Sequence, residues 1–228
     1  MTTEVADGVF QLSPMPYVNV FALRGGDGWT IIDAAIGLLN GRLMSELRTI
    51  GVGPGDVDQI VLTHGHFDHA GGAESLRSAM GARRVLVDGL DLAAVQAGRN
   101  ASGERQSSLA KLDKLDPGYT PVPTAQALDP GQSFTIGDGR SLVPVPTPGH
   151  TDGHLSFHIP ELGIVIGGDT VFNIFRMKPS PGFLCSDADR NLASILKLAA
   201  LQPSVLLLAH GRPVRGDVEG KLRTLAAA

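Results

Sequence analysis

Three histidines and one aspartate lie close together in the stretch VLTHGHFDHAGG, residues 61–72: His64, His66, Asp68 and His69. Imidazole and carboxylate groups are the side chains that hold Zn²⁺, Fe²⁺ or Mn²⁺ in proteins. A tight turn can aim His64 and His66 one way and Asp68 and His69 another, so one loop can serve two metal ions. A lone H-x-H pattern is equally compatible with solvated histidines in a polar helix cap.

The residues around this loop predict a strand before it and a helix after it. QIVLT is short, apolar and β-branched, and AGGAESLRSAM begins like a helix. The loop therefore follows the carboxyl end of a strand, where ligand sites gather in α/β proteins. Three further strand patterns lead to His150, Asp169 and His210. Four strands that end on metal-binding side chains favour a metal site over solvated or core histidines.

These motifs together resemble the metallo-β-lactamase superfamily of metallohydrolases. The matching pieces are H-x-H-x-D-H at 64–69, TPGHT-x-GH at 147–154, GDT at 168–170 and HG at 210–211. Their order and approximate spacing are those of the superfamily. The resemblance implies an α/β (α+β) fold, the αββα sandwich of two mixed β-sheets flanked by helices, with the active site along one edge.

The resemblance also assigns a metal-binding role to seven residues. One ion is expected at His64, His66 and His150, a second at Asp68, His69 and His210, and Asp169 is expected to bridge them. Two divalent ions are implied, with Zn²⁺ preferred and Fe²⁺ or Mn²⁺ as alternatives. Asp68 is the candidate catalytic residue, because a carboxylate beside the nucleophile can orient it and carry its proton.

Other polar residues are expected to orient the ligands without binding metal. Asp33 ends the strand pattern WTIID and matches a strand-end aspartate that recurs in the superfamily; hydrogen bonding to the ligand loop is its expected role. His154 is the second histidine of TPGHT-x-GH and is expected either to orient a ligand or to face the pocket. Asn19, in YVNVF, is assigned a similar structural part.

The reaction implied by such a site is hydrolysis. Two ions about 3.5–4 Å apart share a hydroxide, because they lower the pKa of bound water from about 15.7 to near neutrality. The expected nucleophile is this metal-bridging hydroxide, and its target is the carbonyl of a small ester, lactone or thioester. A persulfide dioxygenase is the main alternative, since enzymes of that class share the fold and would hold one Fe²⁺ at His64, His150 and Asp169. A non-catalytic metal-binding module is the weakest alternative, since all seven ligands are present.

Positions at which this sequence differs from named subfamilies narrow the range of expected substrate classes. True β-lactamases of this fold usually have Cys or Ser in place of Asp169, so an antibiotic substrate is disfavoured. Glyoxalase II enzymes share the motifs but add a C-terminal helical region that binds glutathione, and the 18 residues after His210 are too few for it. Quorum-quenching lactonases share HFDHAGG, although many have a tyrosine where this chain has Phe172. Lactone or other ester hydrolysis is therefore ranked above thioester hydrolysis.

Aromatic and cationic residues near the motifs are candidates for a substrate pocket. The segment 171–185 mixes apolar side chains with two cations, and is either a substrate wall with a cationic anchor or an ordinary packed loop. The candidates are Tyr17, Phe67, Phe172, Phe175, Arg176, Met177 and Phe183. An insertion at 88–125 is longer than an ordinary connection and is either a lid or a solvated excursion.

Composition limits the class of protein. No linker divides the 228 residues, so one domain over 1–228 is expected, with helical patterns at 37–50, 71–81, 89–98, 104–115, 187–201 and 214–226.

A net charge of −4 argues against a nucleic-acid partner and therefore against RNA processing. Apolar runs are too short for a membrane span, the start lacks a signal-peptide pattern, and one cysteine cannot pair within the chain. We expect a cytoplasmic enzyme for a small-molecule substrate; a homodimer is common with this fold but undecided by the chain.

Overall fold

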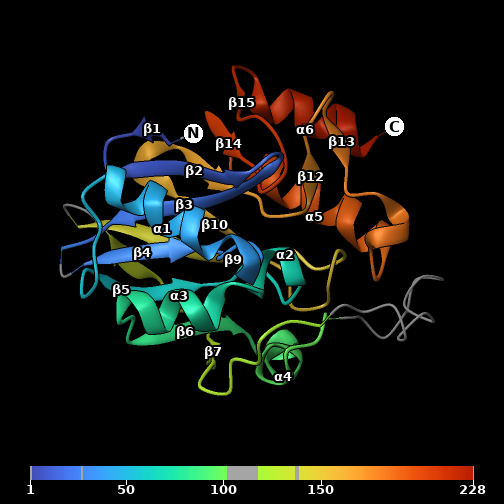
Figure 1. The fold of residues 1–228 in the computed structure, drawn as a ribbon. Helices are drawn as coiled ribbons and strands as arrows, with labels where there is room; N and C mark the ends of the chain where they lie inside the picture. The colour runs from blue at the N-terminus through green and yellow to red at the C-terminus, as the bar shows by residue number, and fades with distance from the viewer. Residues whose placement is uncertain (1, 27, 102–117, 137–138, 228) are drawn as a thin grey trace.

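Two mixed β-sheets pack face to face, with helices on their outer sides (Figure 1). The computed structural model describes residues 2–26, 28–101, 118–136 and 139–227. The layers follow the order helix, sheet, sheet, helix. The αββα sandwich expected from the motifs is therefore confirmed.

The first sheet has seven strands, which lie in the order of the chain. They are β1 (Thr3–Ala6), β2 (Val9–Met15), β3 (Val18–Arg24), β4 (Trp29–Ile32), β5 (Val57–Val61), β6 (Arg84–Asp88) and β7 (Gln126–Leu128). Neighbours are antiparallel from β1 to β4 and parallel from β4 to β7. Because β4 and β5 run in the same direction, Asp33 and the ligand loop after β5 emerge at one edge.

The second sheet has six strands, in the order β15-β14-β11-β10-β9-β8. They are β8 (Phe134–Ile136), β9 (Arg140–Pro146), β10 (Leu155–Ile159), β11 (Ile164–Ile166), β14 (Val205–Leu207) and β15 (Val214–Arg215). The pairing makes β9, β11 and β14 point the same way. The segments that carry His150, Asp169 and His210 follow these three strands and so reach a common edge. A separate ribbon pairs β12 (Val171–Phe172) with β13 (Lys178–Pro179).

Three apolar layers hold the sandwich together. The helices are α1 (Asn40–Thr49), α2 (Phe67–Ala70), α3 (Ala73–Met80), α4 (Gly89–Ala97), α5 (Ala188–Ala200) and α6 (Val218–Ala226), with 3₁₀ turns η1 (Gly37–Leu39), η3 (Pro160–Leu162) and η4 (Gly182–Leu184). One layer joins α1, α3 and α4 to the first sheet, and another joins α5 and α6 to the second. Between the sheets, Phe21 and Phe157 are fully buried. This packing fixes the strand ends that carry the polar residues.

Most expected helices are present, with shifted ends. The pattern at 214–226 is wrong in its first turn, because Val214 and Arg215 pair with β14 and the helix begins at Val218. Asp217 caps that helix by accepting a hydrogen bond from Gly220 N–H. The pattern at 104–115 lies outside the described residues. Within the described part of the chain, no helix is long and apolar enough to cross a membrane.

Candidate metal centre

The strand ends bring seven polar side chains into one cluster. Their ligand atoms form overlapping groups within which all atoms lie within 4.8 Å of one another. The groups are His64, His66 and His150; Asp68, His69 and His210; and His64, His69 and Asp169. These are the seven residues singled out by the motifs, and 146 positions of sequence separate the first from the last. The fold therefore assembles the predicted ligand set in space.

In each of the five histidines of the cluster, one ring nitrogen is held by a neighbouring oxygen. The pairs are His64 Nδ1 with Thr63 Oγ1 (3.0 Å), His66 Nε2 with Ala101 O (3.0 Å), His69 Nδ1 with Asp33 Oδ2 (2.9 Å), His150 Nδ1 with Ser180 Oγ (3.0 Å) and His210 Nδ1 with Tyr17 O (2.9 Å). A ring nitrogen that donates its proton in this way leaves the lone pair on the opposite nitrogen. The five rings are thus oriented as metal-bound histidines are.

The opposite nitrogens converge on two points joined by Asp169. On one side, His66 Nδ1 lies 3.0 Å from His64 Nε2 and 2.9 Å from His150 Nε2. On the other side, Asp68 Oδ2 lies 3.4 Å from His210 Nε2 and 3.8 Å from His69 Nε2.

Asp169 lies between the two sides of the cluster, and its oxygens approach histidines of both. Its Oδ1 lies 3.4 Å from His69 Nε2, and its Oδ2 lies 3.4 Å from His150 Nε2 and 3.3 Å from His210 Nε2. A carboxylate in this position can contact ligands of both groups at once. This is the arrangement that a bridging ligand requires.

Two buried atoms in the cluster show that it suits a cation. His69 Nε2 and Asp169 Oδ1 are buried and lie 3.4 Å apart, yet they form no hydrogen bond with each other or with another described residue. Buried polar atoms are normally paired, so such orphans call for a partner from outside the chain. Imidazole nitrogen and carboxylate oxygen are both donors for divalent metals. The residues present therefore fit divalent metal ions.

The histidines on the first side are held neutral. Burial lowers the pKa of His64 and of His150 well below the usual range, and their histidine neighbours add to the effect. Burial likewise lowers the pKa of His66, against the opposing charge of Asp68. Neutral imidazole is the form that binds metal. These three residues keep their lone pairs free at neutral pH.

The carboxylates on the second side stabilise positive charge. Burial alone would raise the pKa of Asp68, but the charges of His69 and His210 hold it at about 2. Burial would likewise raise the pKa of Asp169, but the charges of His210 and His69 outweigh burial and hold this pKa well below its usual range. In turn the pKa of His210 rises to about 10 despite burial, because of Asp169 and Asp68. The two carboxylates thus stabilise a positive charge beside them, whether it is carried by a protonated histidine or by a metal cation.

Asp33 lies directly behind the ligand loop. Its Oδ1 accepts hydrogen bonds from Thr63 N–H (2.8 Å) and its Oδ2 accepts from His69 Nδ1–H (2.9 Å). The residue is 1 % exposed and has a φ of +64°, a strained conformation that aims the carboxylate at the loop. These contacts are the ones expected of an orienting residue, and its effect on metal binding stays a prediction.

His154 holds the backbone of Asp169. Asp169 N–H donates to His154 Nε2 (2.9 Å), so the other nitrogen carries the proton and donates to Thr147 Oγ1 (2.9 Å). Burial lowers the pKa of His154 to about 3, which keeps this arrangement neutral. Gly168 makes the close approach possible: it has a φ of +55°, and a Cβ there would lie 2.6 Å from His154 Nε2.

The family follows from comparison with known proteins. The family model described as the metallo-beta-lactamase superfamily matches residues 15–210. The chain belongs to the metallo-β-lactamase superfamily. Members of this superfamily are metallohydrolases that bind divalent metal ions, typically zinc, and the His/Asp cluster supplies the candidate ligands here.

Three relatives in the superfamily illustrate its range. The chain is 28% identical over 235 residues to "Probable metallo-hydrolase YflN" of Bacillus subtilis strain 168, covering 93% of this chain and 87% of the relative. It is 30% identical to hydroxyacylglutathione hydrolase of Cereibacter sphaeroides, over 66% of this chain and 47% of that enzyme. It is 28% identical to acyl-coenzyme A thioesterase MBLAC2 of Gallus gallus, over 74% and 65% of the two chains. The chain thus spans about half to two thirds of the length of the two thioester hydrolases.

A solved structure agrees in fold. A B3 metallo-beta-lactamase with an active-site glutamic acid superposes with a TM-score of 0.76 at 23% identity, covering 99% of this chain and 88% of that one. At this identity the likeness shows the metallo-β-lactamase fold alone.

Asp91 is a residue behind the ligand loops that the motifs did not reveal. It is 1 % exposed, and its carboxylate accepts hydrogen bonds from Gly65 N–H (2.9 Å), Thr151 Oγ1–H (2.8 Å) and Gly153 N–H (3.0 Å). It therefore ties the loop of His64 and His66 to the loop of His150. In the sequence it is one more acidic residue in the first turn of a helix, so no local signal distinguishes it.

The candidate pocket residues fall into two groups. Four aromatic residues lie at or near the cluster. The ring centroid of Phe172 is 4.5 Å from that of His210, and Phe67 precedes Asp68 in the chain. Tyr17 O contacts His210 Nδ1 (2.9 Å), and the ring centroid of Phe175 lies 6.0 Å from that of Tyr17. Tyr17, Phe67, Phe175 and Phe183 are all exposed, as is Arg176. Met177 instead packs against the apolar layer under α5 and α6. Its side chain thus contributes to the core, which the alternation of apolar and polar residues could not distinguish from a pocket wall.

The insertion at 88–125 supports the ligand loop at both of its described ends. Ala101 N–H donates to Gly65 O (3.0 Å), and Asn100 Oδ1 accepts from Phe67 N–H (2.7 Å). From the other end, Tyr119 Oη–H donates to Gly65 O (3.1 Å). Residues 102–117, on which the expectation of a lid depends most, lie outside the described residues.

Proposed function

We propose that the chain is a binuclear metal-dependent hydrolase that cleaves the thioester bond of a small-molecule substrate. The observation that carries this proposal is the convergence of two ligand groups on the shared carboxylate of Asp169. His64, His66 and His150 would hold one ion, and Asp68, His69 and His210 the other. Zn²⁺ is the metal proposed, because imidazole and carboxylate donors suit it.

The residues of the site have separate tasks in this proposal. Two bound divalent ions supply a Lewis acid for the carbonyl oxygen and an acidified water molecule as the nucleophile. Asp68 is the proton acceptor, since its carboxylate is ionised at neutral pH and its side chain is 22% exposed, against 1% for that of His69. Asp33, Asp91 and His154 orient the ligands, while the exposed aromatic rings of Tyr17 and Phe67 would line the approach.

Thioesters are favoured over the lactones and esters that the motifs alone ranked first. Two relatives bear names of thioester hydrolases, one for glutathione thioesters and one for coenzyme A thioesters. Phe172 lies beside His210 and brings no hydroxyl group to polarise a lactone. A sulfur leaving group needs less help, because a thiolate is a more stable anion than an alkoxide.

A substrate panel tests the reaction. Purified protein is assayed with an acetyl thioester, an aryl acetate and a lactone, before and after dialysis against a chelator and after Zn²⁺ is restored. We expect chelation to remove more than about 90% of turnover, Zn²⁺ to restore it, and the thioester to have the highest kcat/KM. Highest turnover on the lactone would contradict the substrate class. O₂ consumption with persulfides, without hydrolysis, would contradict the reaction and support the dioxygenase.

A further inference from the structure

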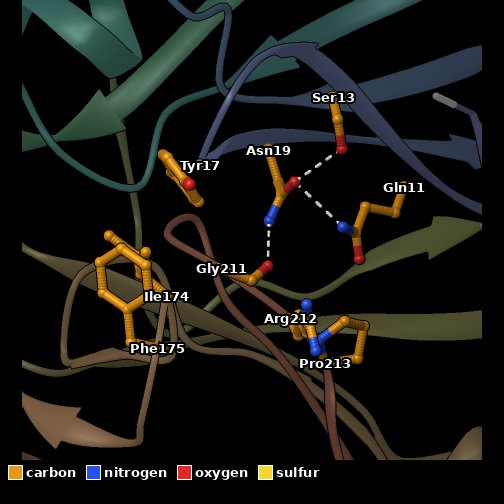
Figure 2. A pocket seen from close by; sticks show the side chains of 9 residues that line it. All are labelled: Gln11, Ser13, Tyr17, Asn19, Ile174, Phe175, Gly211, Arg212 and Pro213. Carbon is orange, nitrogen blue, oxygen red and sulfur yellow. Dashed lines mark hydrogen bonds between the residues drawn. The ribbon is translucent and has the colours of Figure 1, made fainter.

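A pocket of about 300 Å³ opens where residues of β2 and β3 meet Gly211 and Arg212, in the segment that follows β14 (Figure 2). Gln11, Ser13 and Asn19 line one side, and Gly211 and Arg212 line another. We call this the Gln11–Arg212 pocket. The lining is polar on these two sides, and Tyr17, Ile174, Phe175 and Pro213 complete it with apolar surface.

Asn19 fixes the orientation of the polar groups in this pocket. It is 4% exposed, and its Nδ2 donates to Leu208 O and Gly211 O, both at 2.8 Å. Its Oδ1 therefore faces the other way and accepts from Gln11 Nε2 (3.0 Å) and Ser13 Oγ (2.8 Å), as Figure 2 shows. Since the amide nitrogen of Gln11 is committed to Asn19, the oxygen of Gln11 points elsewhere.

Gln11 Oε1 is a buried acceptor that lacks a hydrogen-bond partner in the described part of the chain. Buried acceptors of this kind are costly unless a donor reaches them. Gln11 lines the pocket, so a ligand N–H group there supplies the missing donor once the covered oxygen turns toward it. An amide N–H on a bound molecule has the required chemistry.

Arg212 supplies the opposite kind of group. Its side chain is exposed, and no carboxylate of the described residues forms an ion pair with it. Glu46 is the acidic residue that contacts the pocket residue Ser13, and its carboxylate faces other donors: it accepts from Ser13 N–H (2.8 Å) and Thr2 Oγ1–H (3.2 Å). A planar guanidinium group that lines a pocket suits a carboxylate or phosphate.

The pocket is joined to the second ligand group through the backbone. Gly211 and Arg212 follow His210 directly, and Tyr17 O accepts from His210 Nδ1–H (2.9 Å). Tyr17 also lines the pocket. Tyr17 and the residues that follow His210 are therefore shared between the pocket and the surroundings of the second ligand group, which places the two side by side.

We infer that the Gln11–Arg212 pocket binds the thiol-bearing arm of the substrate, and that this arm carries an amide N–H and an anionic group. The inference rests on the proposed thioester hydrolysis. Gln11 Oε1 accepts from the amide, and the Arg212 guanidinium pairs with the carboxylate or phosphate. The arm leaves as a thiol after the C–S bond breaks, water supplying the OH of the acid product and the proton of the thiol.

Three acetyl thioesters test the inference by kinetics. S-Acetylglutathione carries amides and carboxylates, acetyl-CoA carries amides and phosphates, and S-acetyl-N-acetylcysteamine carries an amide alone. We expect Arg212→Ala to raise KM about 10-fold or more for whichever anionic thioester is the better substrate, and to leave the neutral one within about twofold. Gln11→Leu should raise KM for all three. Arg42→Ala removes an exposed cation on α1 and is the matched control.

Binding measurements separate failure of the pocket from failure of the reaction. S-Methylglutathione and S-methyl-CoA cannot be hydrolysed, and their Kd values are measured by calorimetry on the wild type, Arg212→Ala and Arg42→Ala. Binding that weakens only in Arg212→Ala supports the pocket even if no thioester is cleaved, and preference between the two ligands identifies carboxylate or phosphate. Unchanged KM and Kd in Arg212→Ala would overturn the inference, whether or not the wild type hydrolyses thioesters.

Discussion

Asp169→Asn is expected to lower kcat/KM on the best thioester by about 10²- to 10⁴-fold, with one metal ion lost per chain. The substitution keeps the shape of the side chain but removes the negative charge between His69 and His210. Breaking a buried charge pair by removing one partner costs about 3–5 kcal/mol, which corresponds to this range of rates. Metal content and steady-state kinetics measured on the same preparation check both parts.

The control for Asp169→Asn is Asp129→Asn, in the exposed loop between β7 and β8. It makes the same chemical change outside the cluster and should alter neither metal content nor turnover. Full activity and two ions per chain in Asp169→Asn would show that Asp169 does not bridge the two groups.

Asp91→Ala is expected to lower the unfolding temperature and to reduce turnover together. The substitution leaves three buried donors, on Gly65, Thr151 and Gly153, without their acceptor. Each unpaired donor costs about 1–3 kcal/mol, so a fall of at least about 6 °C in Tm is expected for a chain of this length. Turnover should fall about 10- to 100-fold, as when outer partners of metal ligands are removed.

Asp88→Ala provides the comparison on the same helix. Asp88 caps α4 by accepting from Leu90 N–H (2.9 Å), so its loss should cost about 1 kcal/mol of stability and leave turnover unchanged. Differential scanning calorimetry and the thioester assay give the two readouts. Equal effects of the two substitutions on turnover would show that Asp91 stabilises the helix without positioning the ligand loops.

The sandwich and the seven clustered residues could be predicted from the sequence because short local motifs contain the residues on which both predictions depend. His64, His66, Asp68 and His69 share one turn, and the other three end strands whose patterns are legible in the sequence. Parallel strands then bring these ends to one edge, as the structure shows.

The contacts of Asp91 and the roles proposed for Gln11 and Arg212 could not be predicted in the same way. Asp91 acts on Thr151, 60 residues away, and only the packing of two loops reveals the contact. Gln11 is a polar residue on an otherwise ordinary strand until Asn19 fixes its amide. Met177 shows the converse case, since an apolar residue in a promising segment lies against the helical core. Such roles depend on contacts distant in sequence, which local patterns do not contain.

The number of metal ions per chain tests the central claim most directly. Inductively coupled plasma mass spectrometry on the purified wild-type protein, after gel filtration into metal-free buffer, measures it. The account predicts close to two divalent ions per chain, chiefly Zn²⁺, held by the two groups that meet at Asp169. A single iron per chain, or no tightly bound metal after saturation with Zn²⁺, would contradict it.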